Sequence, residues 1–184
     1  MKKLAVLSML LLFACLGQIQ AQTVKEMTRE QKKVEQEALD QMLYDEAKQA
    51  IDAKKFVLEA DQVMFKYGTT AYVSTNTNFV AVNGNKAVVQ VAFNIPVGGP
   101  NGLGGVTVDG DVSGYKQTVD KKGNITVSMN VMGVGISAQV NIQLTNGSNN
   151  ASVDISPNFN SNRFTLNGSL VPMFKANVFK GRSF

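Results

Sequence analysis

The sequence predicts a mostly β protein with one N-terminal helix, folded as an antiparallel meander of about nine or ten strands. We expect the meander to curve into a barrel-like sheet, lipocalin-like in outline. Three observations predict this. Apolar and polar residues alternate along successive segments from residue 55 onward, Asn/Gly turns separate those segments, and only the stretch before residue 55 has apolar residues at helical spacing.

The segment 22–54 is predicted to form an amphipathic helix. The stretch "EMTREQKKVEQEALDQMLYDEAKQAIDAKK" contains neither Gly nor Pro and is rich in helix-forming residues. We expect its apolar face to pack on the protein's own sheet; a partner-binding or coiled-coil role is the alternative. The apolar residues recur three, four or seven positions apart: Met27, Val34, Ala38, Met42, Leu43, Ala47, Ala50 and Ile51.

Residues 55–184 are predicted to form the antiparallel β domain, which makes one structural domain with the helix. Alternation is most regular in "NITVSMNV", "GISAQVNIQLT", "ASVDIS" and "RFTLNGSLV". Asn83–Asn85, Asp120–Asn124 and Thr145–Asn150 are predicted hairpin turns, because Asn and Gly accept positive φ. So many twisted strands either close into a barrel or fold into a two-sheet sandwich, which is the alternative.

The first residues, 1–21, are typical of a secretory signal peptide. A basic start, "MKK", precedes an apolar run from Leu4 to Leu16 that is too short to span a bilayer. "IQA" predicts cleavage after Ala21, whereas "LFAC" loosely resembles a lipobox in which Cys15 would be acylated. We therefore expect an exported protein that is periplasmic, secreted or otherwise associated with the envelope, and that meets a membrane only through such a lipid anchor.

The composition excludes the commonest catalytic and metal sites. The chain has no His, and its one Cys lies within the predicted signal peptide, so neither a His-assisted nucleophile nor a typical zinc, copper or haem site is expected. We predict no catalytic residue, metal or cofactor. Basic residues after residue 61 are scattered, without an Arg-rich stripe or interleaved aromatics, so no nucleic-acid partner is expected.

A carboxylate-dependent hydrolase of unknown substrate is the enzymatic alternative. Its best candidate residues are Asp109 and Asp111, because residues two apart on a strand point to the same face and could share a site. Two exposed carboxylates on a strand are more commonly just solvated.

The outward positions of the later strands are polar but almost uncharged. Such a face suits hydrogen bonding to a neutral glycan or to another envelope protein; the alternative is a merely solvated strand face. A small apolar molecule inside the barrel is a further candidate ligand. The outward residues are Thr126, Ser128, Asn130, Ser137, Gln139, Asn141, Gln143, Ser152, Thr165, Asn167 and Ser169.

An outer-membrane β-barrel is a minor alternative, suggested by the same alternation and by the last residue, Phe184. Counting back by twos from Phe184 reaches Arg182 and Lys180, which are charged where a lipid-facing strand needs apolar side chains. The chain also lacks Trp.

Neither of two glycine-rich stretches is expected to form a nucleotide site. "GVGISA" at Gly133–Ala138 is followed by strand alternation rather than by a helix, so a dinucleotide site is not expected. The stretch around "GPNGLGG" lacks the Lys-Ser/Thr of a phosphate loop and is predicted to be a long connection between strands. It remains a candidate binding loop through Gly98, Gly99, Asn101, Gly102, Gly104 and Gly105.

Four segments resemble one known family over nearly the whole chain after the signal peptide. These are "QVAFN", "GPNGLGGVTVDG", "ISPNFNSNRFTLNGSLVP" and "FKGRSF". The chain resembles a family of small secreted Bacteroidetes proteins classed as a domain of unknown function, family number 4251. The resemblance implies a signal-bearing envelope protein, and it transfers no functional residue because the family has no established activity. The function expected from the sequence is thus a non-catalytic binding or structural module.

Overall fold

The computed structural model describes residues 28–92, 105–158 and 163–181. The predicted signal peptide with Cys15 and Ala21, and the loop residues 98–104, lie outside the described residues. The elements are α2 (Arg29–Asp52), β1 (Lys55–Phe65), β2 (Thr70–Tyr72), β3 (Phe79–Asn83), β4 (Lys86–Val91), β5 (Val106–Val119), β6 (Ile125–Gly133), β7 (Ser137–Leu144), β8 (Asn150–Pro157), β9 (Phe164–Pro172) and a short 3-10 helix, η1 (Met173–Lys175).

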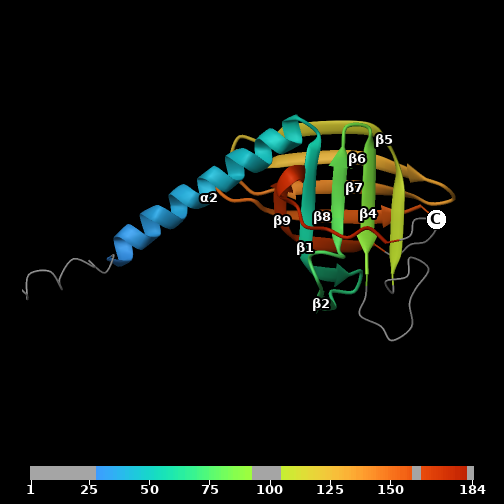
Figure 1. The fold of residues 1–184 in the computed structure, drawn as a ribbon, viewed down its shortest axis with the longest axis horizontal. Helices are drawn as coiled ribbons and strands as arrows, with labels where there is room; N and C mark the ends of the chain where they lie inside the picture. Colours follow the sequence, from blue (N-terminus) through green and yellow to red (C-terminus); the bar gives the residue numbers. More distant parts are fainter. Residues whose placement is uncertain (1–27, 93–104, 159–162, 182–184) are drawn as a thin grey trace, which may run out of the picture. The chain divides into compact units, whose positions relative to one another are not determined.

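The described strands form one antiparallel sheet that closes on itself. Its order is β2-β1-β3-β4-β5-β6-β7-β8-β9, and β1 also pairs with β9 from Phe56 to Phe65. Eight strands therefore make a closed barrel, while β2 adds a ninth strand beside the later part of β1 (Figure 1). The predicted barrel is confirmed. The two-sheet sandwich is wrong, because the β1–β9 hydrogen bonds join the two ends of a single sheet.

Side chains at alternate positions of the strands fill the interior. On β6, for example, Ile125, Val127, Met129 and Val131 are all at most 2% exposed, as the alternation predicts. Each such side chain contributes about 1.5–3 kcal/mol on burial. The wall and the helix together form one apolar cluster, in which the largest members include Phe56, Leu58, Ile142, Leu144, Ile155, Leu166, Leu170 and Ile51.

The turn between β5 and β6 shows how the Asn/Gly segments close hairpins. Gly123 has a positive φ of 86°, which L side chains rarely adopt. The Asp120 carboxylate accepts hydrogen bonds from the backbone N–H of Lys122 at 2.7 Å and from both the backbone and the side-chain amide of Asn124. Because these bonds stabilise the charged form, above all the one from the Asn124 side chain, they hold the pKa of Asp120 below its ordinary value of 3.8.

Helix α2 begins at a capping box. The backbone N–H of Thr28 donates to the Gln31 side chain at 3.0 Å, and the Gln31 N–H donates back to the Thr28 hydroxyl at 3.3 Å. The predicted packing of the apolar face on the protein's own sheet is seen in the second half of the helix. Met42 is 50% exposed, and the buried residues of the helix are Tyr44, Ala47, Ala50 and Ile51.

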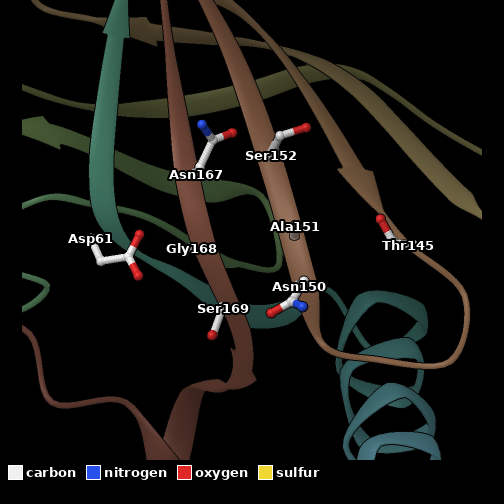
Figure 2. Close-up of a pocket in the computed structure, with 8 residues that line it drawn as sticks. All are labelled: Asp61, Thr145, Asn150, Ala151, Ser152, Asn167, Gly168 and Ser169. Carbon is white, nitrogen blue, oxygen red and sulfur yellow. The ribbon is translucent and has the colours of Figure 1, made fainter. Parts of the chain in front are cut away.

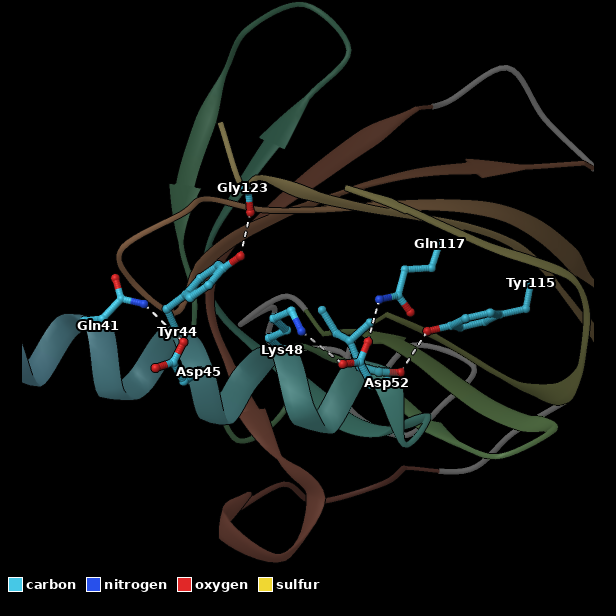
Figure 3. A network of polar contacts seen from close by, with 9 residues as sticks. Gln41, Tyr44, Asp45, Lys48, Asp52, Tyr115, Gln117 and Gly123 are labelled. Atoms are coloured by element: carbon cyan, nitrogen blue, oxygen red, sulfur yellow. Dashed lines mark hydrogen bonds and ion pairs between the residues drawn. The ribbon is translucent and has the colours of Figure 1, made fainter. Parts of the chain in front are cut away.

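Polar contacts fix the end of α2 to one end of the barrel (Figure 3). The Tyr44 hydroxyl donates to the Gly123 carbonyl at 2.5 Å, and the Tyr115 hydroxyl donates to the Ile51 carbonyl at 3.2 Å. Burial, together with a smaller contribution from the negative charge of Asp52, raises the pKa of Tyr115 to about 12, so this phenol stays protonated and remains a donor.

The C-terminal segment 176–181 lies over the outer face of the wall. The backbone N–H of Phe179 donates to the Asn76 carbonyl at 2.7 Å, and that of Asn177 donates to the Glu59 carboxylate at 2.7 Å. This cover explains why Gln90 and Thr107, although they point outward, are both 0% exposed.

The side chain of Gln90 joins this segment to the wall. Its amide nitrogen donates to the carbonyls of Thr77 at 2.9 Å and Phe179 at 2.7 Å. Its oxygen accepts from the Thr107 hydroxyl at 3.0 Å and from the Gly181 N–H at 2.7 Å. All four hydrogen-bonding positions of a buried amide are thus satisfied, as burial requires.

Candidate functional site

A polar groove of about 360 Å³ lies on the outer surface where β1, β9 and β8 are neighbours (Figure 2). Most of its lining side chains are amides or hydroxyls, and one is a carboxylate. The lining residues are Asp61, Thr145, Asn150, Ala151, Ser152, Asn167, Gly168 and Ser169.

A β-bulge places Asp61 in the groove. The register between β1 and β9 shifts between Ala60 and Gln62, so Asp61 has no partner on β9. Its carbonyl instead accepts a hydrogen bond from the N–H of Val73 at 2.8 Å. Bulges commonly re-aim a side chain in this way.

Gly168 allows β9 to lie close against the bulged strand. A Cβ at this position would come within 2.0 Å of the Glu59 carbonyl oxygen, so any other residue would push the two strands apart. The bulge and this glycine together shape the floor of the groove.

A row of outward side chains continues from the groove across neighbouring strands. Asn167 is paired with Gln62 on one side and with Ser152 on the other, and its amide donates to the Gln62 side-chain oxygen at 2.8 Å. Residues directly opposite on antiparallel strands point to the same face. The cross-strand row is therefore Tyr72, Gln62, Asn167, Ser152, Gln143 and Thr126, on β2, β1, β9, β8, β7 and β6 in turn.

Most polar atoms of the groove are available to a ligand. Within the described residues, the side chains of Asp61, Ser152 and Ser169 make no hydrogen bond to other protein groups, and Asn167 uses only its amide nitrogen. Amides and hydroxyls both donate and accept, while the carboxylate accepts only. This combination matches a ligand that carries many neutral hydroxyl groups. No group of three metal-ligating side chains occurs among the residues that the structure describes.

The sequence predicted part of this site. Ser152, Asn167 and Ser169 were expected on the outward polar face, whereas Asp61, Thr145 and Asn150 were missed. The core-facing residues of β1 lie at positions 56, 58, 60 and then 63, and this break in the alternation marks the bulge at Asp61. Val57 and Met64, which are also apolar, mask the break in the sequence.

The two candidate carboxylates of a hydrolase have separate partners. Lys86 lies 2.7 Å from Asp111, and Lys180 of the C-terminal segment pairs with Asp109. The hydrogen bond with Asp111 raises the pKa of Lys86, with smaller contributions from the charges of Asp111 and Asp109. Each carboxylate is thus neutralised by its own lysine on the outer wall.

Of the predicted glycine-rich loop, only Gly105 is described. A Cβ there would lie 1.8 Å from the Val91 carbonyl oxygen, so the glycine permits a close backbone approach at the base of the connection between β4 and β5. "GVGISA" forms the turn from β6 to β7, with Gly135 at a φ of 75°, and opens no helix.

A second pocket, of about 580 Å³, lies between the end of α2, the start of β1 and η1. Its lining is mainly apolar and includes Ala50, Pro172, Met173 and Phe174. It is less suited than the polar groove to a hydrogen-bonding ligand.

Fold and groove together define a small antiparallel barrel protein with the second half of α2 packed on it and a polar groove on its outer wall. The profile of a domain of unknown function, DUF4251, matches residues 38–170, and the chain belongs to this family. The chain is similar to a DUF4251 family protein from Bacteroides eggerthii known from a crystal structure, with 58% identity and a TM-score of 0.69; the match covers 80% of this chain and 99% of that one. No curated protein matches the chain.

The family match confirms the resemblance drawn from the four sequence segments, and the source of the similar protein fits the Bacteroidetes. In the part of the chain that the structure describes, no helix has the length and apolar character needed to cross a membrane.

Proposed function

We propose that this protein is an exported, non-catalytic binding module whose polar groove binds a neutral, hydroxyl-rich ligand, namely a glycan. The observation that carries the proposal is a set of polar side chains whose hydrogen-bonding atoms are unused among the described residues, namely Asp61, Ser152 and the side-chain oxygen of Asn167, gathered in one groove on the barrel wall. Sites on strands hold such groups more firmly than sites on loops.

The chemistry of the groove favours a neutral ligand. Asp61 can accept hydrogen bonds from two neighbouring hydroxyls, and Asn167 presents a free acceptor whose position is set by its hydrogen bond to Gln62. An anionic ligand would be repelled by Asp61, the single charged residue in the lining. Asp109 and Asp111 are engaged by lysines, which favours binding over hydrolysis as the role of the outer wall.

The test is a screen of neutral oligosaccharides followed by isothermal titration calorimetry. We expect Asn167→Ala and Asp61→Asn each to weaken binding by about tenfold, since one hydrogen bond to a ligand contributes about 1–2 kcal/mol. The matched control is Gln139→Ala, an exposed outward amide on β7 outside the groove, which should bind as the unaltered protein does. Absence of binding to every neutral glycan, or unchanged binding by Asn167→Ala, would overturn the proposal.

Export is part of this proposal and rests on the N-terminal sequence. Mass spectrometry of the protein purified from its own host distinguishes the two routes. A chain that begins at Gln22 supports cleavage after Ala21, and an acylated Cys15 supports a lipid anchor. A retained Met1 contradicts both.

A further inference from the structure

We propose that Tyr72 is an aromatic subsite of the groove and that the ligand is a linear neutral glycan that crosses β2, β1, β9 and β8. This inference rests on the proposed function and adds to it a ligand shape, a direction of binding and a further contact residue.

Tyr72 lies in line with the groove. It is the last residue of β2, the strand outside the closed barrel, and it is paired with Gln62 of β1. Gln62 is in turn paired with Asn167, and Asn167 with Ser152. Paired residues share a face, so the phenol ring stands at one end of the row whose middle is the hydrogen-bonded Gln62–Asn167 pair.

Among the described residues, Tyr72 makes no contact that would give its side chain a role in stabilising the fold. The side chain is 87% exposed, lies outside the apolar core cluster, and makes no hydrogen bond to another described residue. Tyrosine supplies a large, rigid contact area at a small cost in conformational entropy, and it is enriched in binding surfaces. The C–H face of a sugar ring can pack on the ring while the sugar's hydroxyls reach the neighbouring amides.

Strand spacing suits an extended chain of sugars. Neighbouring strands lie ~4.8 Å apart, so the row from Tyr72 to Ser152 spans three spacings, or ~14 Å. One spacing is close to the advance of one pyranose unit along an extended chain. Consecutive sugars would therefore meet Tyr72, then Gln62 with its neighbour Asp61, then Asn167, and then Ser152, and a single sugar at the groove would not reach Tyr72.

The experiment measures affinity against ligand length. Neutral gluco-, manno- and xylo-oligosaccharides of one to six units are titrated by calorimetry into the unaltered protein and into Tyr72→Ala, Tyr72→Phe and Asn167→Ala. Tyr67→Ala is the matched control, because Tyr67 is also 89% exposed and lies in the turn between β1 and β2, off the cross-strand row. Circular dichroism confirms that each variant is folded.

We expect affinity to rise with chain length in the unaltered protein. Tyr72→Ala should weaken binding of the longer oligosaccharides by about tenfold, the effect of losing one stacking platform, and leave that of the monosaccharide unchanged. Tyr72→Phe and Tyr67→Ala should bind normally.

The outcomes separate the two proposals. If long oligosaccharides bind, depend on Asn167 and ignore Tyr72→Ala, the aromatic subsite is wrong and the proposed function stands. If no oligosaccharide of any length binds, or if Asn167→Ala has no effect, both the aromatic subsite and the proposed function are wrong. In that case, a protein partner that no longer binds Tyr72→Ala would assign the cross-strand row to protein recognition.

Discussion

Replacing Gln90 with alanine should destabilise the protein by releasing its C-terminal segment. Gln90 makes four hydrogen bonds while 0% exposed, two of them to residues 179 and 181. At about 1 kcal/mol each, the four contribute about 4 kcal/mol to the free energy of unfolding. About half of this depends on the segment being in place.

A double-mutant cycle measures that half. Urea denaturation measures how much Gln90→Ala lowers the free energy of unfolding, once in the full protein and once in a chain that ends at Lys175. We expect the substitution to cost about 2 kcal/mol less in the shortened chain, because two partners are already gone. Hydrogen exchange at the amides of Phe179 and Gly181 should also accelerate in the full-length variant.

The control is Gln139→Ala, an exposed amide on β7, which should change stability by less than about 0.5 kcal/mol. The reasoning is refuted if Gln90→Ala costs the same with and without residues 176–184, or if exchange at Phe179 and Gly181 is unchanged. Either result would mean that the segment is held by contacts other than the Gln90 amide.

Two further predictions concern the helix and the β5–β6 turn. Tyr44→Phe removes the 2.5 Å hydrogen bond to the Gly123 carbonyl and should lower the free energy of unfolding by about 1 kcal/mol, whereas Tyr67→Phe, at an exposed ring, should have no measurable effect in the same urea titration. Asp120→Asn should lower Tm at neutral pH, because the lowered pKa of Asp120 means that its charged form stabilises the fold above pH 3.8. That stability is lost as pH falls through the folded-state pKa, so the Tm difference should vanish in acid; a difference that is independent of pH would contradict the assignment.

The sequence predicted which side chains point into the barrel more reliably than it predicted which strands pair with one another. Alternation placed Ile125, Val127 and Met129 inside the barrel, and Asn167 outside it, as the structure has them. On α2 the same kind of argument failed for Met42, because helical spacing shows which residues share a face and not how much of that face is covered.

The groove is harder to predict than the strands that form it. Ser152 and Asn167 could be assigned to an outward polar face, but Asp61 reaches them only because β1 pairs with β9 and bulges at that residue. Nothing local in the sequence specifies that the first and last long strands are partners. The burial of Gln90 was equally hard to predict. Gln90 occupies an ordinary outward strand position, and it is buried only because a segment about ninety positions later lies over it.

The sequence by itself determined the helix, the strands, the turns and the almost uncharged outer face of the later strands, because all of these depend on periods of two or 3.6 residues and on turn chemistry within a few positions. Only the tertiary structure decided that the sheet closes, that Asp61 joins Asn167 and Ser152, and that Tyr72 stands in line with them. These depend on strand register between residues about a hundred positions apart, which the packing of the whole barrel selects.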